Sequence, residues 1–352
     1  MSQSLPTLKS IAATLHLSVG TVQRALNGKG GYSEETRQRV LREAEKCGYH
    51  VNPAASALRR NTVTLAVVLP EPVGINAPYF CQVWHGIHQA QKELKIYQVE
   101  LRTVYAGANQ HEDVFFRALN TLAEDGQIQG IITLTSGHPD FQACARKLEA
   151  SGKRVAYLNR PDNRWHLFSS RQAGALAADI MHTAVGSRPG QYLLLAGTLD
   201  NHLLRDRSAG FMEAMARYAP DRSILEIREY HRSEKLHDTL KQLLTAVPCI
   251  CGIYAVSSRE TLAMCRVLQE TQRKGKITAI GTDAFPALLP FFEDNTLTAS
   301  IYFYPARLAY TIFYTLASEL ATIPVPGLAL STPAVPVFRS SASLFCSKEG
   351  IL

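Results

Sequence analysis

The stretch TLKSIAATLHLSVGTVQRALNGKGGYSEETRQRVLREAEKCGYHVNPAASALRR, residues 7–60, decides the fold of the N-terminal part of the chain. Thr7 is a good helix-capping residue, and the apolar residues over the next two turns recur at helical spacing. Ser18 can cap a second helix, whose buried stripe would include Val22 and Ala25. The two helices are therefore predicted to lie only a tight turn apart.

A third helix is expected after the glycine-rich break at Asn27–Gly31. Ser33 precedes two glutamates, which are favoured at the positive N-terminal end of a helix, and the helical pattern stops at Gly48. Helix, tight turn, helix, loop and helix is the pattern of a helix-turn-helix unit, whose second helix enters the DNA major groove. On spacing alone, a three-helix structural unit without DNA function is the alternative.

Positive charge is concentrated in the same segment. Residues 1–62 contain nine Lys and Arg against four Glu, a net charge of +5 out of +7 for the whole chain of 352 residues. A basic segment of this kind is typical of a surface that meets phosphates, although a solvated helical face also carries such charges. The charge distribution supports the DNA-binding interpretation without deciding it.

Residues 7–60 as a whole resemble the lactose-repressor (LacI/GalR-type) family of transcriptional regulators. The resemblance is continuous across the three expected helices, the Gly48-Tyr49 stop and the segment Asn52-Pro53-Ala54-Ala55. It implies that residues 1–49 form a helix-turn-helix DNA-binding domain whose partner is double-stranded operator DNA. It also implies a ligand-responsive, sequence-specific regulator, by default a repressor of a carbohydrate uptake or catabolism operon.

The resemblance assigns DNA contacts residue by residue. Family positions at base edges match Val19, Gly20 and Arg24, and Gln23, where a small serine is usual, either contacts an adenine or fills space. Family positions at phosphates match Thr7, Ser18, Thr21, Asn27, Ser33 and Thr36. Because Gly20 has no side chain and Val19 offers only methyl groups, base readout would depend on Arg24 together with a thymine-methyl contact at Val19. His16 replaces the customary turn glycine, so its backbone must keep a negative φ or accept strain.

Residues 50–62 are expected to form a hinge. A proline suited to a first helical turn precedes good helix formers, but the segment is too short for a stable helix of its own. In the family this segment folds on operator DNA, where the leucine that matches Leu58 enters the minor groove. Leu58 and Arg59 are therefore predicted DNA contacts, and a plain linker is the alternative.

From Val63 onward, short apolar runs alternate with amphipathic helical windows. The strand candidates are TLAVVL, YQVEL, GIITLT, RVAYLN, QYLLLA, ILEIREY, CGIYAV, KITAIG and TASIYF. This alternation predicts an α/β fold with doubly wound parallel sheets, and a weaker continuation of the resemblance implies the two-lobed periplasmic-binding-protein-like fold. The expected effector-binding and dimerisation domain spans residues 63–352, with an N-lobe at about 63–165 and 299–325 and a C-lobe at about 166–298 and 326–346.

Ligands bind beyond the carboxyl ends of strands in such sheets. The residues that the resemblance assigns to an effector are Tyr79, Phe80, Arg207, Ser257, Asp283 and Phe303. An arginine fork and a carboxylate suit polyhydroxylated molecules, so a sugar, sugar phosphate or polyol is the expected class; structural salt bridges are the alternative. At Ser257 and Phe303 the chain departs from the family pattern, and the effector's identity is therefore not implied.

The sequence contains no constellation typical of an enzyme. His85 and His88 lie three residues apart without an acid or cysteine at ligand spacing, and no Gly-X-Ser-X-Gly elbow or complete phosphate loop is present. We expect no enzymatic activity, no cofactor and no metal. A solute-binding protein without DNA function and a sugar-processing α/β enzyme are the alternatives.

Location and assembly are also predicted from absent patterns. The N-terminus lacks the features of a secretory signal, and no apolar run approaches the roughly 18 residues of a membrane span, which favours a cytoplasmic protein without a membrane partner. The proline-containing tail after Ala321 has no heptads for a tetramerising coiled coil. A homodimer is therefore expected, since a two-fold operator mirrors a two-fold protein.

Overall fold

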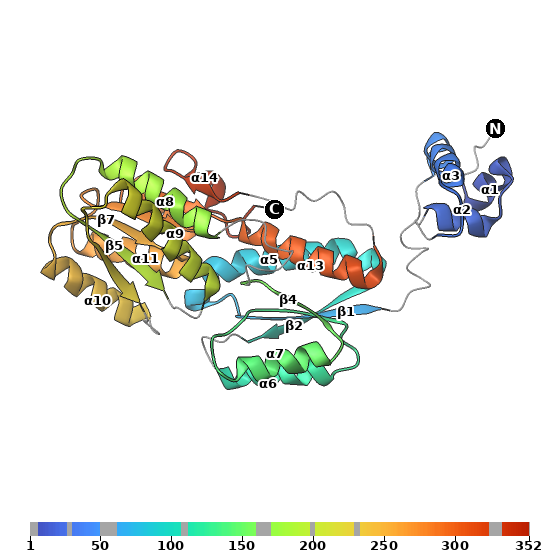
Figure 1. Cartoon of the computed structure of the whole chain (residues 1–352), viewed down its shortest axis with the longest axis horizontal. Coiled ribbons are helices and arrows are strands. Elements are labelled where there is room, and N and C mark those ends of the chain that lie inside the picture. Colours follow the sequence, from blue (N-terminus) through green and yellow to red (C-terminus); the bar gives the residue numbers. More distant parts are fainter. Residues whose placement is uncertain are drawn as a thin grey trace. The chain divides into compact units, whose positions relative to one another are not determined.

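The computed structural model describes residues 6–26, 30–49, 62–106, 112–159, 170–197, 201–228, 233–323 and 333–351. The chain divides into two compact units, Met1–Asn61 and Thr62–Leu352 (Figure 1). Three of the predicted DNA contacts, Asn27, Leu58 and Arg59, lie outside the described residues.

Three helices pack around a small core in the N-terminal unit. They are α1 (Leu8–Leu15), α2 (Val19–Leu26) and α3 (Glu34–Lys46). The buried side chains between them are Ile11, Ala12, Val22, Ala25, Val40 and Ala44. Helix α1 ends at His16, whose φ of 55° lies in the left-handed region. Of the two outcomes expected for His16, the chain therefore adopts the strained one.

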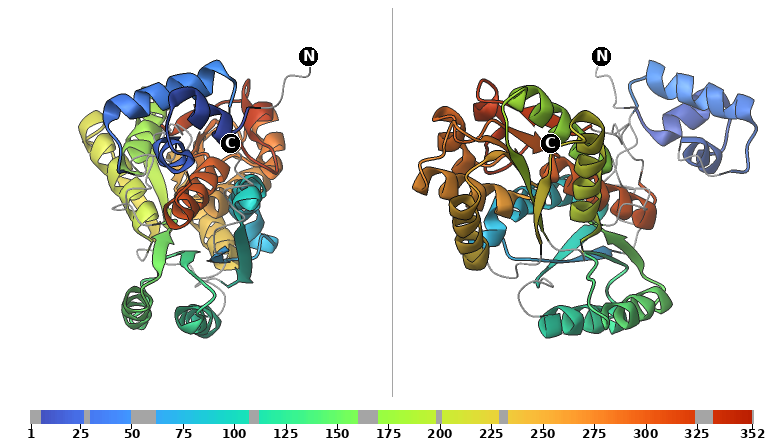
Figure 2. Two further views of the ribbon diagram at one scale, coloured as in Figure 1. Left: turned by 90° about the vertical axis from the view of Figure 1, so that its right-hand side faces the viewer. Right: turned by 60° about the vertical axis from the view of Figure 1, so that its left-hand side comes forward.

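The N-lobe contains a four-stranded parallel sheet in the order β2-β1-β3-β4. Its strands are β1 (Val63–Leu69), β2 (Val99–Tyr105), β3 (Gly130–Thr133) and β4 (Arg154–Tyr157), and its helices are α5 (Ala77–Leu94), α6 (Glu112–Glu124), α7 (Phe141–Ala150) and α13 (Pro305–Ala321). Because side chains alternate along a strand, Leu65 and Val67 join the core beneath α5 and α13, whereas Ala66 and Val68 join the core beneath α6 and α7. Figure 1 shows these helix pairs on opposite sides of the sheet, and α6 and α7 lie side by side in Figure 2.

The C-lobe contains a six-stranded sheet in the order β10-β9-β8-β7-β5-β6. Its strands are β5 (Gln191–Gly197), β6 (Ile224–Arg228), β7 (Ile250–Ala255), β8 (Thr278–Thr282), β9 (Ala299–Tyr302) and β10 (Val335–Val337). Its helices are α8 (Ser170–Val185), α9 (His202–Tyr218), α10 (Ser233–Ala246), α11 (Ser258–Glu270), α12 (Leu289–Glu293) and α14 (Ala342–Phe345). Helices α8 and α9 pack on one face of the sheet, and α10, α11 and α12 pack on the other. Strand β10 pairs antiparallel with β9, and the remaining pairs are parallel.

The point at which the chain returns from the C-lobe to the N-lobe differs from the sequence prediction. That prediction assigned residues 299–325 to the N-lobe. Strand β9 pairs with β8 on one side and with β10 on the other, so it belongs to the C-lobe sheet. Of the predicted segment, α13 packs in the N-lobe core. The chain crosses between the lobes at Tyr304, whose φ is 53°. The apolar pattern of a strand identifies it as a strand but does not say which sheet it joins, which explains the error.

Helices α8 and α9 approach each other at backbone distance. A Cβ atom on Gly174 of α8 would lie 1.9 Å from the carbonyl oxygen of Arg207, and one on Gly210 of α9 would lie 1.9 Å from that of Arg171. No side chain fits at either distance, so this packing requires glycine at both positions. The position of α9, and of Arg207 on it, is therefore set by a contact between glycine and backbone.

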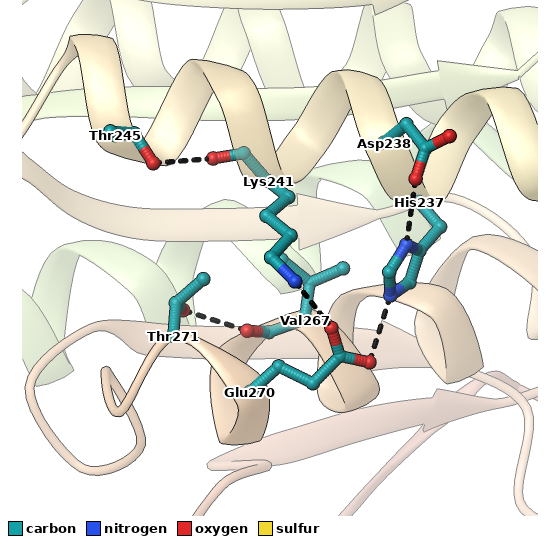
Figure 3. A network of polar contacts seen from close by, with 7 residues as sticks. All are labelled: His237, Asp238, Lys241, Thr245, Val267, Glu270 and Thr271. Atoms are coloured by element: carbon teal, nitrogen blue, oxygen red, sulfur yellow. Dashed lines mark hydrogen bonds and ion pairs between the residues drawn. The ribbon is translucent and has the colours of Figure 1, made fainter.

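A polar network joins α10 to α11 on the exposed side of the C-lobe (Figure 3). Glu270 of α11 accepts hydrogen bonds from His237 Nε2 at 2.9 Å and from Lys241 Nζ at 3.1 Å. The other ring nitrogen of His237 lies 3.2 Å from a carboxylate oxygen of Asp238. These hydrogen bonds, and above all the one to Glu270, raise the pKa of His237.

Candidate functional site

The hydroxyl residues that the sequence predicts at phosphates lie at the N-termini of the three small helices. Thr7 and Ser10 form a capping box, in which the Ser10 N–H donates to Thr7 Oγ1 at 3.1 Å. At the second helix, the Thr21 N–H donates to Ser18 Oγ at 3.0 Å, and at the third the Thr36 N–H donates to Ser33 Oγ at 3.2 Å. Each hydroxyl is therefore held in place by its own helix.

Helix α2 presents the predicted base-reading residues to solvent. Val19 is 40% exposed, and Gly20, Gln23 and Arg24 are exposed as well. The guanidinium of Arg24 lies beside the Gly31 backbone, since a Cβ on that glycine would stand 3.5 Å from its Nη1. The four residues predicted to read or lie beside base edges are thus all exposed on α2.

In the C-lobe, three of the predicted effector residues meet beyond the carboxyl ends of the strands. Arg207 of α9 is buried, and its Nη1 donates to the Val256 carbonyl at 2.9 Å. Its guanidinium carbon lies 3.8 Å from the centre of the Phe303 ring, within cation–π distance. Asp283 follows strand β8 and lies near Arg207, whose charge lowers its pKa. The structure therefore brings Arg207, Phe303 and Asp283 close to one another, and their role as effector contacts stays a prediction.

Asp283 is held in an unusual state. Its φ is 67°, a region in which Asp is tolerated better than most residues, and its N–H donates to the Ile301 carbonyl at 2.8 Å. Burial raises the pKa of the Asp283 carboxyl to about 6, against the opposing effects of Arg207 and of a hydrogen bond from Ser258. The carboxylate thus titrates much closer to neutrality than an exposed aspartate.

The N-lobe contributes Tyr79 to the same site. Burial raises the pKa of the Tyr79 hydroxyl, the charge of Asp283 adds to this effect, and Arg207 opposes it, so the ring lies close to both charged groups. The ring of Phe80 meets Tyr79 edge-on, with their centres 5.1 Å apart. Tyr79 of one lobe therefore lies near the charged pair of the other, and Phe80 packs beside Tyr79 against the N-lobe core.

The effector role of Ser257 stays a prediction. Ser257 lies at the start of α11 and its side chain makes no capping hydrogen bond, whereas the hydroxyl that bonds Asp283 belongs to Ser258. Glu260, which the sequence analysis did not select, is fully buried and pairs with Arg259 at 3.1 Å. A signal was present, but Ser257 followed three residues later by Glu260 is also the pattern of an ordinary capping box.

Several buried polar atoms at this site have no hydrogen-bond partner among the described residues. They are Arg207 Nε, Asp283 Oδ1 and Glu260 Oε2. Each such atom costs about 1–3 kcal/mol when it is buried without a partner. Natural proteins retain few of them, and they are therefore candidates for bonds to a molecule with both donors and acceptors.

A family model described as a periplasmic binding protein domain matches residues 67–322. The chain belongs to this family. Its relatives also confirm the predicted resemblance to LacI/GalR-type regulators. The chain is 27% identical over 292 residues to the ribose operon repressor of Bacillus subtilis, an alignment covering 80% of this chain and 82% of that protein. It is 25% identical over 287 residues to the HTH-type transcriptional regulator CelR of Thermobifida fusca, covering 76% and 78%.

A solved structure shows the same two-lobed fold. The periplasmic solute-binding protein of Actinobacillus succinogenes, determined with bound D-allose, has a TM-score of 0.68 at 17% identity, covering 81% of this chain and 100% of that one. The relatives named here are regulators and binding proteins, not enzymes. Among the described residues, no group of three His, Cys, Asp or Glu could hold a metal ion, and no helix is long and apolar enough to span a membrane.

Proposed function

We propose that the chain is a cytoplasmic, effector-responsive repressor that binds operator DNA as a homodimer and controls genes of carbohydrate uptake or catabolism. The N-terminal unit would bind DNA as a helix-turn-helix domain, and the two-lobed unit would bind a sugar-like effector. The observation that carries the proposal is that one chain combines an exposed helix α2, capped by Ser18, with a buried Arg207–Asp283 site.

The N-terminal unit offers the chemistry that DNA requires. Helix N-termini carry partial positive charge and free N–H groups, which favour phosphates, and the flanking hydroxyls of Thr7, Ser18 and Ser33 stand at three such ends. Arg24 provides the donor pair that matches a guanine edge, and the exposed Val19 suits a thymine methyl group. The net charge of +5 in residues 1–62 adds attraction that does not depend on sequence.

The two-lobed unit offers the chemistry that a polyol requires. Asp283 accepts hydrogen bonds, Arg207 donates them, and Tyr79 and Phe303 supply apolar faces for the C–H side of a ring. The carbohydrate class also agrees with the names of the relatives, a ribose operon repressor and a protein with bound D-allose. An effector acts on DNA binding only through its different affinity for two arrangements of the domain, which typically amounts to about 1–3 kcal/mol.

DNA binding is tested with the full chain by selecting duplexes from a random library. We expect a two-fold symmetric sequence to be enriched. Arg24→Ala should weaken binding to that sequence by about 10- to 100-fold, the range for one bidentate base contact. Arg42→Ala, an exposed arginine on α3, is the matched control and should change binding much less. Enrichment of no sequence, or equal losses for the two variants, would contradict the proposal.

Effector binding is tested by the thermal unfolding of the full chain with D-ribose, D-allose and other neutral monosaccharides. A sugar at 100 times its Kd should stabilise the protein by about 2.7 kcal/mol. Arg207→Ala should remove this stabilisation, while Arg205→Ala on the same helix should retain it. A protein that binds sugar normally but selects no DNA would instead support the alternative of a solute-binding protein, which the fold alone also allows.

A further inference from the structure

A second polar cluster lies directly behind the effector site and joins the two lobes. Its centre is Gln82 of α5, which is 1% exposed. Gln82 Nε2 donates to the Ala284 carbonyl at 2.7 Å and to the Ser347 carbonyl at 3.2 Å, and Gln82 Oε1 accepts from the Tyr302 hydroxyl at 3.0 Å. We call these four residues the Gln82 cluster. The side-chain amide uses both its donor and its acceptor capacity, unlike the unpartnered atoms of the neighbouring site.

The three cluster residues outside the C-terminal segment, Gln82, Ala284 and Tyr302, lie close in sequence to residues of the effector site. Gln82 follows Tyr79 by three positions, so both lie on one face of α5. Ala284 directly follows Asp283, and Tyr302 directly precedes Phe303. The cluster therefore links residues adjacent to the N-lobe side of the site with residues adjacent to its C-lobe side.

The C-terminal segment Ala342–Ile351 provides the remaining contacts of the cluster. Besides the Ser347 carbonyl, the Ile351 N–H donates to the Tyr302 hydroxyl at 3.2 Å. The Phe345 ring packs against Tyr302 with centres 5.4 Å apart. Gly350 has a φ of 75°, and a Cβ there would lie 2.8 Å from Gln82 Oε1. The segment thus fits against Gln82 because position 350 lacks a side chain.

We propose that Gln82 is a positioning residue for the effector site and that Ala342–Ile351 acts as a strap that holds it. While the strap is docked, Gln82 fixes α5 against the loop after β8, and Tyr79 stays near Asp283. Release of the strap removes the Gln82–Ser347 and Ile351–Tyr302 hydrogen bonds and uncovers the bonds of Gln82 to Ala284 and Tyr302, which loosens α5 from the C-lobe. The inference rests on the proposed effector site for its meaning, but the contacts themselves do not depend on it.

Hydrogen exchange of the full chain, measured without DNA or effector, tests this proposal. Gln82→Leu should speed exchange about tenfold or more in residues 76–83 and in the strap, because buried polar groups lose their partners. Gly350→Ala should do the same without altering Gln82, since the added methyl group expels the strap. Exchange in β5, at the centre of the C-lobe core, should stay unchanged.

Two matched variants complete the test. Gln89→Leu replaces a half-buried glutamine of the same helix that bonds only Glu93 among the described residues, and Glu349→Ala removes an exposed side chain next to Gly350; both should exchange like the wild type. The proposal is overturned if Gly350→Ala frees the strap while residues 76–83 keep their protection. It is also overturned if Gln82→Leu speeds exchange in β5 as much as in the strap, which would indicate a general loss of stability. Neither result depends on whether the chain binds DNA.

Discussion

The N-terminal unit and the effector site differ in the burial and in the hydrogen bonding of their polar side chains. The hydroxyls at the starts of α1, α2 and α3 are exposed and hydrogen-bonded within a few residues of themselves. The effector site instead buries Arg207, Asp283 and Glu260, and leaves one polar atom of each without a partner. One surface is stable before it meets its partner, whereas the other carries a free-energy cost that a ligand would reduce.

The two regions also differ in what positions their functional groups. Ser18 caps α2 through a hydrogen bond from Thr21, three residues away, and Arg24 lies in the last turn of the same helix. Both residues are therefore positioned by local interactions. Arg207 is placed by the contact of α9 with a helix from another part of the sequence. A glycine-to-alanine substitution should therefore change the stability of the protein in opposite directions in the two regions.

The largest effect is expected for Gly174→Ala. Its Cβ would stand 1.9 Å from the Arg207 carbonyl, and backbone cannot rotate away as a side chain can. Overpacking usually costs about 1–3 kcal/mol, and we expect at least the upper end of that range here. Denaturant unfolding of the full chain measures the loss.

Gly20→Ala in α2 is the matched counterpart. A Cβ at Gly20 would meet only Ser18 Oγ, at an ordinary 3.8 Å. Alanine favours a helix over glycine by about 0.5–1 kcal/mol, so this variant should stabilise α2. Equal losses of stability in the two variants would remove the distinction between local and long-range positioning.

The next effect concerns the buried Asp283. Its pKa is raised to about 6 in the folded chain, so the folded state binds more protons than the unfolded state between about pH 4 and 6. Stability that is present at pH 4 is therefore lost as the pH rises through 6, by about 2–3 kcal/mol for a shift of this size. Asp283→Asn keeps the shape and the left-handed backbone but cannot titrate.

Unfolding curves of the wild type and Asp283→Asn at pH 4 and pH 8 check this expectation. The stability of the wild type relative to the variant should fall by that amount between the two values, whatever the offset at pH 4. A constant difference across the range would mean that Asp283 is not held in an unfavourable charged state.

The same contrast explains what the sequence could predict. The caps at Thr7, Ser18 and Ser33 are local, so helix starts and the exposed face of α2 follow from spacing within a few residues. Burial of Glu260 depends on packing against distant elements, and its pattern with Ser257 resembles an exposed cap. Arg207 and Asp283 were found through family resemblance, because no local rule shows that they meet.

Strand pairing sets a similar limit. The run 298–303 was recognised as a strand, but its placement beside β8 required the tertiary fold. Strand β10, at Val335–Val337, was not predicted at all, because three residues around a proline carry no alternating pattern. Local order was therefore predictable in both units, and long-range pairing was not.

A smaller effect is expected at His16, where the local design of the N-terminal unit is imperfect. A φ of 55° costs a residue with a side chain about 1–2 kcal/mol. Glycine would relieve this strain, but its greater freedom in the unfolded state takes back part of the gain. His16→Gly should therefore stabilise the unit by about 0.5–1 kcal/mol. Hydrogen exchange of α1 and α2 in the full chain measures the gain. His16→Ala retains the strain and should show no gain; a gain of the same size would assign the effect to the imidazole instead.

The smallest effect lies outside both regions, at His237. Because its pKa is raised above 6.5, its bonds to Glu270 and Asp238 stabilise the fold fully below that pH and lose this contribution as the pH rises through the raised value. Glu270 is 43% exposed, so screening keeps the contribution below about 0.5 kcal/mol. His237→Gln should remove this loss above pH 6.5 and leave the Asp283 change, which falls between pH 4 and 6, intact. If His237→Gln altered the lower range as well, the two titrations could not be assigned to separate sites, and the stability of the effector site would depend on the α10–α11 surface.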